Sequence, residues 1–223
     1  MLPAAVLNSI KDFMTINQVM EIFDAILRIS AALVGQNRDS IGNERYFHHM
    51  FSFLAAQQLG GNACWDELRL RPEYPTTQRF CRKKINVYDP RSTAVEGVGT
   101  GRKGNLDFVI EGSPRTLVEW KGPTIYSEKE ILEALLKLLT EPEQDVKVIA
   151  AVFTTSETDR NDHRKTIKNR FQNCLTIALQ VLQEKSLTAD LATLNLHAYM
   201  ASIPRNGLQK IYWGPVTADL VLQ

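Results

Sequence analysis

Long apolar runs and paired cysteines are both missing from this chain of 223 residues. No segment stays apolar over the roughly 20 residues that a bilayer span requires, and the first ten residues lack the basic start of a signal peptide. The three cysteines, Cys64, Cys81 and Cys174, form no Cys-x-x-Cys pair, so neither a disulfide framework nor a structural zinc site is expected. We therefore predict a cytoplasmic protein with no membrane partner.

A marked excess of either charge is also lacking, because 26 Lys and Arg residues balance 25 Asp and Glu residues. The net charge of +1 argues against indiscriminate binding to polyanions, but it leaves room for a local basic face. Internal repeats and low-complexity segments are absent too. The length suits one domain with a real core, so we predict a single domain over residues 1–223, with a helical extension at 1–40 and the core at 41–223.

The most informative stretch is a predicted β-hairpin. Two runs rich in β-branched and aromatic residues, Gly104 to Ile110 and Arg115 to Pro123, flank the turn sequence Glu-Gly-Ser-Pro. Asp107 interrupts the first run, whereas Glu119 and Lys121 stand two apart in the second and so point to one face of a strand. A buried carboxylate is costly unless it lies beside a cation, so these three side chains predict a site for a hard divalent metal ion.

Asp107, followed after eleven residues by Glu119-Trp120-Lys121, resembles the PD-(D/E)xK motif of the restriction-endonuclease-like nuclease superfamily. Leu106 stands where the proline of the motif would be. The resemblance implies an α/β fold with a mixed β-sheet core flanked by helices, here with an added N-terminal helix. It also implies a metal-dependent DNA endonuclease of the restriction, repair or defence type, with Mg²⁺ as the cofactor and Mn²⁺ as its substitute.

The resemblance also implies roles for individual residues. Asp107 and Glu119 would hold one or two metal ions, with the backbone carbonyl of Trp120 as a further ligand. Lys121 would orient the attacking water or help to deprotonate it. Many members carry an acid on the helix before the sheet, and here Glu44 would be that catalytic and metal-binding residue. The alternative for Glu44 is a carboxylate that stabilises the positive end of its helix.

Helical periodicity predicts the elements around the hairpin. One helix begins with the capping box Thr15 to Gln18, and a second carries Glu44 near its start. His48 lies one turn after Glu44 on the same face, and we predict an exposed or hydrogen-bonded histidine there rather than a ligand. The later predicted elements are a helix ending before Pro142, a strand at 146–153 covered on both sides, a helix from about 161, and strands at 194–203 and 211–213. This order of helices and strands predicts a mixed sheet with helices on both faces.

The segment before the hairpin is basic and rich in proline and glycine. Pro72 and Pro75 restrict any strand here to a sheet edge. Glycines from Gly97 to Gly104 predict a mobile basic loop beside the metal site, where positive side chains would contact phosphates. The alternative is a strand edge whose charges prevent aggregation. The nucleic-acid-binding residues predicted on the first hypothesis are Arg79, Arg82, Lys83, Lys84, Arg102 and Lys103.

Two functions from other classes remain open. The chain could be a non-catalytic nucleic-acid-binding subunit, although pure binding has no use for carboxylates that face a polyanion. The charged triad could instead be a buried ion pair in an unrelated α/β interaction protein. The nuclease hypothesis requires the carboxylates of Asp107 and Glu119 to lie close together on one face. Its expected partner is DNA, with RNA not excluded and a homodimer left open.

Overall fold

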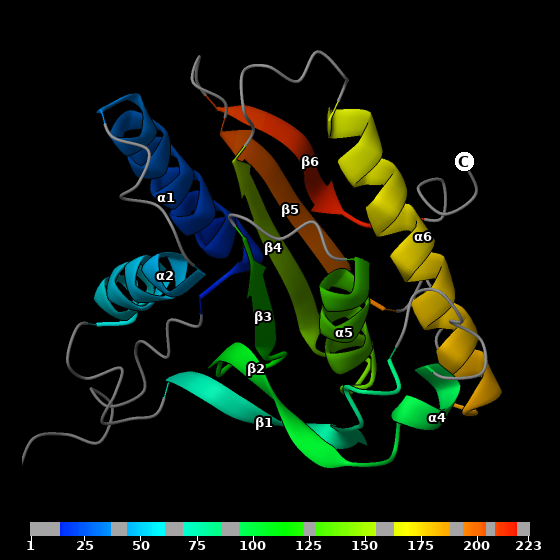
Figure 1. Ribbon diagram of the computed structural model, residues 1–223. Helices are drawn as coiled ribbons and strands as arrows, with labels where there is room; N and C mark the ends of the chain where they lie inside the picture. The colour runs from blue at the N-terminus through cyan, green and yellow to red at the C-terminus, as the bar shows by residue number, and fades with distance from the viewer. Residues whose placement is uncertain are drawn as a thin grey trace, which may run out of the picture.

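The computed structural model describes residues 14–36, 44–60, 69–85, 94–122, 128–154, 163–187, 194–203 and 208–217. Within these ranges the chain forms one mixed sheet with helices against it, which confirms the predicted α/β class (Figure 1). The strands are β1 (Leu70–Phe80), β2 (Arg102–Ile110), β3 (Thr116–Lys121), β4 (Val146–Thr154), β5 (Leu196–Ile203) and β6 (Gln209–Pro215). The helices are α1 (Ile16–Gln36), α2 (Glu44–Gln58), the short α4 (Val95–Gly97), α5 (Glu128–Leu139) and α6 (His163–Glu184).

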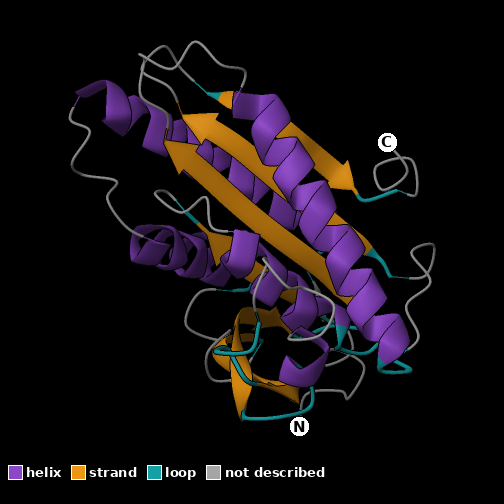
Figure 2. Cartoon of the chain, turned by 45° about the vertical axis from the view of Figure 1, so that its right-hand side comes forward, coloured by secondary structure: helices purple, strands orange, loops and turns teal. Residues whose placement is uncertain are grey.

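The sheet is mixed because its strands, which lie in chain order, pair in two ways. β1, β2 and β3 form an antiparallel meander, β3, β4 and β5 are parallel, and β6 returns antiparallel to β5. Parallel neighbours need a crossover connection, which α5 supplies between β3 and β4 and α6 supplies between β4 and β5. Both crossover helices cover one face, whereas α1 and α2 cover the other (Figure 2).

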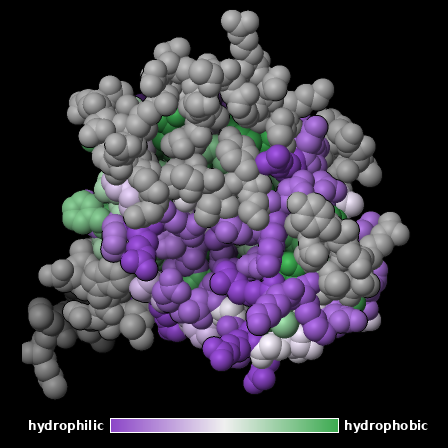
Figure 3. Space-filling view, viewed as in Figure 1, coloured by the Kyte–Doolittle hydropathy of each residue, from purple (hydrophilic) through white to green (hydrophobic). Residues whose placement is uncertain are grey.

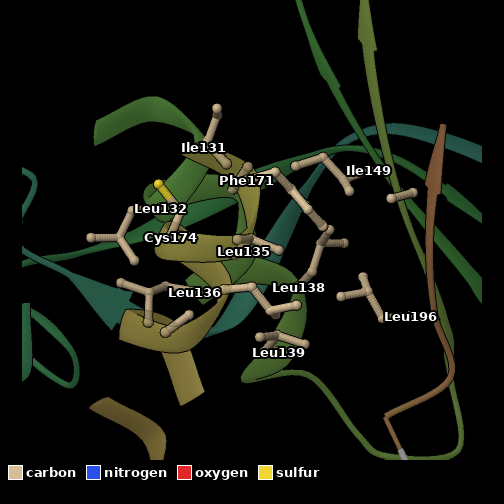
Figure 4. Close-up of a cluster of buried hydrophobic side chains, with 14 of the residues drawn as sticks. Ile131, Leu132, Leu135, Leu136, Leu138, Leu139, Ile149, Phe171, Cys174 and Leu196 are labelled. Atoms are coloured by element: carbon tan, nitrogen blue, oxygen red, sulfur yellow. The ribbon is translucent and has the colours of Figure 1, made fainter. Parts of the chain in front are cut away.

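Strand β4 is buried on both sides, as its apolar run predicts. Ile149 and Phe153 belong to the core beneath α5 and α6, whereas Val148 and Val152 belong to the core beneath α1 and α2. Leucines of α5 fill the first core together with Phe171 of α6 (Figure 4). The two cores fix the position of the central strands, and the candidate site lies at the end of one of these strands.

Helix α1 begins where the predicted capping box places it. The N–H of Thr15 donates to the side chain of Gln18 at 2.7 Å, and the N–H of Gln18 donates to the Thr15 hydroxyl at 3.3 Å. Val19, Phe23 and Ile26 are then buried against the sheet. The segment predicted as an extension therefore shares a core with α2. None of the described helices, α1 included, is both long and apolar enough to cross a membrane.

Strand β2 begins earlier than the glycine-rich sequence predicts. Arg102 and Lys103, which were expected in a mobile loop, pair with the end of β1. The Thr76 hydroxyl of β1 fixes Gly104, which follows Lys103. It accepts a hydrogen bond from the Gly104 N–H at 2.9 Å and donates one to the Gly104 carbonyl oxygen at 3.1 Å. Pairing with an edge strand thus overrides the local preference of glycine for a loop. β1 itself lies at the edge of the sheet, as its two prolines predict.

Gly122 follows β3 with a φ of +139°, a conformation that other residues rarely adopt. A Cβ at this position would overlap the backbone carbonyl oxygen of Val152. Gly122→Ala should therefore destabilise the fold by more than about 1 kcal/mol in chemical denaturation. Gly214→Ala is the matched control, because Gly214 has a φ of +150° but open space around it. Equal losses in the two variants would contradict the steric explanation.

Candidate functional site

The predicted site residues lie where β2 and β3 separate. Backbone pairing between the two strands is described as far as Phe108 and Val118. Beyond this pair the N–H of Trp120 donates instead to Asp107 Oδ2, at 2.6 Å. The carboxylate of Asp107 therefore takes the place of a backbone acceptor, and the opening between the strands leaves room for charged side chains.

Side chains of β3 alternate between the two faces of the sheet. Trp120 packs into an aromatic cluster with Phe23 of α1 and Phe47 of α2, at ring-centroid distances of 4.8 and 5.5 Å. Glu119 points to the opposite face, where it meets Lys137 of α5, whereas the ammonium of Lys121 lies 3.5 Å from Glu44 of α2. The prediction that Trp120 packs in the core is confirmed.

Glu119 is fully buried and lies between two lysines. Lys137 of α5 donates to Glu119 Oε1, and Lys121 Nζ lies 3.2 Å from Glu119 Oε2. Lys137 also donates to the Asn105 carbonyl at 2.7 Å, which ties α5 to β2. Burial raises the pKa of Glu119 above its usual value, and the positive charges of the two lysines oppose this effect. Lys137 is not among the residues predicted for the site, although a lysine between two leucines on the buried side of the amphipathic helix α5 is a signal of a buried partner.

The ammonium group of Lys121 lies at the centre of the site. Its Nζ is 3.5 Å from Glu44 Oε1 and 3.8 Å from Asp107 Oδ2, and it donates to the Trp120 carbonyl at 2.5 Å. Burial alone would lower the pKa of Lys121, but the charges of Glu119, Asp107 and Glu44 raise it above its usual value, so Lys121 stays protonated. The structure thus gathers the predicted acids around one cation, with the Trp120 carbonyl directed at the same place.

His48 also lies beside the two carboxylates, where an exposed or hydrogen-bonded histidine is predicted rather than a ligand. Its Nε2 is 3.6 Å from Glu44 Oε1 and 3.6 Å from Asp107 Oδ2, and its ring edge contacts Phe108. Burial alone would lower the pKa of His48, but the two carboxylates outweigh burial and raise the pKa to about 9. In turn, His48 and the nearby lysines hold the pKa of Asp107 below its usual value despite its burial. The spacing of four residues from Glu44 was the signal for this contact.

Glu44, His48 and Asp107 form a group that could hold a metal ion. One ligand atom from each lies within 4.8 Å of the others. Carboxylate oxygens and an imidazole nitrogen are common ligands of divalent metal ions in proteins. Glu44 is also the first residue of α2, so its negative charge stabilises the positive end of the helix dipole.

The site lies in the wall of a cavity of about 810 Å³. Hydrophilic side chains gather on this face of the molecule (Figure 3). Among the residues that line the cavity, seven are lysine or arginine and four are aspartate or glutamate. Of the predicted nucleic-acid-binding residues, Arg82, Lys83, Arg102 and Lys103 line the cavity, whereas Arg79 and Lys84 do not.

Comparison with known proteins does not assign the chain to a family. Neither a protein-family model, nor a curated protein, nor a solved structure matches the chain. The function is therefore argued from the site itself.

Ion pairs orient part of the basic surface. Arg82 donates to Glu133 of α5 at 3.0 Å, which holds its guanidinium beside the cavity. Lys84 instead pairs with Glu96 at 2.9 Å, outside the cavity. Exposed lysines and arginines next to buried carboxylates can attract a phosphodiester and place it beside a bound cation. This combination of charges can support phosphate binding and metal-assisted hydrolysis.

Proposed function

We propose that the chain is a metal-dependent nuclease of the restriction-endonuclease-like type that hydrolyses phosphodiester bonds in DNA. The observation that carries the proposal is the convergence of three carboxylates, from α2, β2 and β3, on Lys121 beside a cavity rich in basic side chains. The order of elements supports the proposed fold. A helix, the β1–β2–β3 meander, α5 and the parallel strand β4 follow one another as in the core of that superfamily.

Each residue has a distinct role in the proposed reaction. Asp107 and Glu44 would hold Mg²⁺ or Mn²⁺, and the ion when bound would supply a water of lowered pKa and stabilise pentavalent phosphorus. Lys121 acts as an ammonium ion rather than as a base, because the carboxylates keep it protonated. It orients the attacking water and offsets the charge that develops on the phosphate. Glu119 holds the ammonium of Lys121 at the end of β3.

One observation favours a second candidate function. Glu119 is fully buried between two lysines, as in a structural ion-pair network of an α/β interaction protein. Such a network needs neither the exposed basic residues around the cavity nor the cluster of Glu44, His48 and Asp107. The two candidates differ most clearly in whether the chain cleaves nucleic acid and in whether it binds metal.

The direct test of the proposal is cleavage by the purified chain. Plasmid, linear or branched DNA should be cut when Mg²⁺ or Mn²⁺ is present, and a chelator should stop the reaction. RNA of matched sequence tests the other substrate, and Ca²⁺ should not support cleavage. An absence of cleavage with every substrate and metal ion in this set would overturn the proposal.

The basic cavity wall gives a separate prediction. Lys103→Glu should weaken DNA binding about tenfold and flatten its dependence on salt concentration, because one exposed phosphate contact is replaced by a repulsive charge. Lys84→Glu is the matched control, since it makes the same charge change at an exposed residue outside the cavity. Equal affinities and salt slopes in the two variants, measured by fluorescence anisotropy, would favour the charged-edge alternative.

A further inference from the structure

Helices α1 and α2 present exposed apolar side chains on the outside of the molecule. Among the described residues, the large apolar side chains that are exposed are Ile29 of α1 and Phe53 of α2, with relative exposures of 40% and 60%. Both belong to the helix pair that covers the face of the sheet opposite α5 and α6 (Figure 1). A single exposed apolar residue needs no explanation, but two on one helix pair beside a hollow indicate an interaction surface.

The hollow lies between the same two helices and has a volume of about 260 Å³. Its wall combines apolar side chains with hydrogen-bonding ones, as in the binding pockets of protein interfaces. The apolar residues are Ile22, Ala25 and Leu54, and the polar ones are Glu21, Gln57 and Gln58. An apolar cavity of about 150 Å³ is large enough for benzene, so this hollow has room for a phenyl ring.

Phe53 lies beside the hollow without filling it. On α2 it directly precedes Leu54 and stands one turn before Gln57, two residues that line the hollow, but its own ring is not part of the wall. On α1, Ile29 likewise follows Ala25 by one turn. The surface therefore offers a projecting aromatic ring and, next to it, a hollow of the size that such a ring requires.

A surface with both a projection and a matching hollow fits a second copy of itself. A two-fold axis between the two features brings Phe53 of each chain to the hollow of the other, so that the same contact is made twice. Aromatic side chains seated in pockets supply much of the binding energy of protein interfaces. His49 and Gln57 lie one turn on either side of Phe53, where they would meet the polar edge that Glu21 makes acidic.

The area of the helix pair is sufficient for a specific dimer. α1 has 21 residues and α2 has 15, so the helices are about 31 Å and about 22 Å long, and the pair is about 20 Å wide. Such a face can bury about 500 Å² per chain, which reaches the total of roughly 1,000 Å² that a biological interface needs. An interface of this size should form reversibly as the concentration rises.

We infer that the outer surface of α1 and α2 is a homodimer interface in which Phe53 of each chain fills the hollow between α1 and α2 of the other. The wall of this hollow shares no residue with the wall of the large cavity, so dimer formation does not use the residues of the candidate site. The inference goes beyond the proposed function, because such a dimer suits a nuclease and an interaction protein alike.

The experiment is sedimentation velocity of the full chain over the micromolar range of concentrations. The native chain should convert from monomer to dimer as its concentration rises. Phe53→Ala should weaken dimerisation about a hundredfold or more, because the lost contact occurs twice, and should leave the Tm unchanged, since Phe53 is exposed. Tyr212→Ala is the matched control, because Tyr212 is a partly buried aromatic residue that packs against the core on the opposite face of the sheet.

A second variant tests the hollow instead of the ring. In Ala25→Trp the indole should fill the hollow from its own chain, so this variant should be monomeric although it keeps Phe53. A mixture of the two variants then combines an open hollow on Phe53→Ala with an intact ring on Ala25→Trp. Heterodimers with one intact contact should form, and a fluorescent label on one variant detects them.

Each outcome decides between the two copies and a lone chain. A native chain that stays monomeric, a dimer that survives Phe53→Ala, or a mixture of folded variants without heterodimers overturns the inference. Phe53→Ala changes only an exposed side chain and decides by itself if Ala25→Trp does not fold. A dimer that cuts no substrate would sustain the inference and refute the nuclease proposal, whereas a monomer that cuts DNA would do the reverse.

Discussion

Lys121→Met should lower the rate of DNA cleavage by about 10²- to 10⁴-fold, while DNA binding stays near its original strength. Methionine keeps the length of the side chain but removes the ammonium that faces Glu44, Asp107 and Glu119. On the nuclease proposal this charge acts on the attacking water and the developing phosphate charge, so its loss should affect the chemical step. Single-turnover cleavage with saturating enzyme measures that step directly.

Thermal unfolding of the same variant separates catalysis from architecture. Without metal, Lys121→Met leaves the buried carboxylate of Glu119 with one positive neighbour instead of two. The free energy of unfolding should fall by up to about 3–5 kcal/mol, the range for a broken buried ion pair. Lys137 still holds Glu119, which should keep the loss at the lower end. Added Mn²⁺ or Mg²⁺ should raise the Tm of the variant more than that of the native chain, because Lys121 no longer competes for the carboxylates.

The structural ion-pair candidate predicts a different result for these melts. Lys121→Met would be destabilised to the same extent with and without divalent metal, since no ion could replace the missing ammonium. The native chain would also show no metal-dependent rise in Tm and no cleavage. His49→Ala, at an exposed residue beside the site, checks that any metal effect is specific.

The hairpin was predictable from sequence because its information is local. The β-branched runs, the turn residues and the spacing of two between Glu119 and Lys121 all depend on neighbours along the chain. The same holds for the capping box of α1 and for the doubly buried strand β4. Strand alternation also gave the directions of Trp120 and its neighbours.

The remaining parts of the site depend on contacts between distant elements. Lys137 comes from a crossover helix, and no local pattern states that its ammonium meets Glu119. His48 shares a helical face with Glu44, but its contact with Asp107 requires the packing of α2 beside β2. The glycines around Arg102 and Lys103 favour a loop, and pairing with β1 overrides that preference. The motif in the sequence thus indicates Asp107, Glu119 and Lys121, whereas their contacts with Lys137 and His48 depend on tertiary packing.

Trp120→Ala should cause the largest loss of stability among these substitutions, about 3–5 kcal/mol in chemical denaturation. The indole is almost completely buried and packs on Phe23, Phe47 and Phe51 of the two helices that cover this face. Its backbone also donates to Asp107 and accepts from Lys121. The aromatic cluster therefore holds the strand segment from which Glu119 and Lys121 reach the site.

Two further variants make this last prediction specific. Trp213→Ala applies the same change to a partly exposed indole on β6, which lies against Lys210 at 4.3 Å, and should cost clearly less. Trp120→Phe should retain most of the stability and the Mn²⁺ affinity, because the indole N–H has no hydrogen-bond partner among the described residues and a smaller ring can still contact Phe47. Equal losses in Trp120→Ala and Trp213→Ala would show that the aromatic cluster does not hold β3 in place. A loss of Mn²⁺ binding in Trp120→Phe at native stability would instead mean that ring shape itself positions the site.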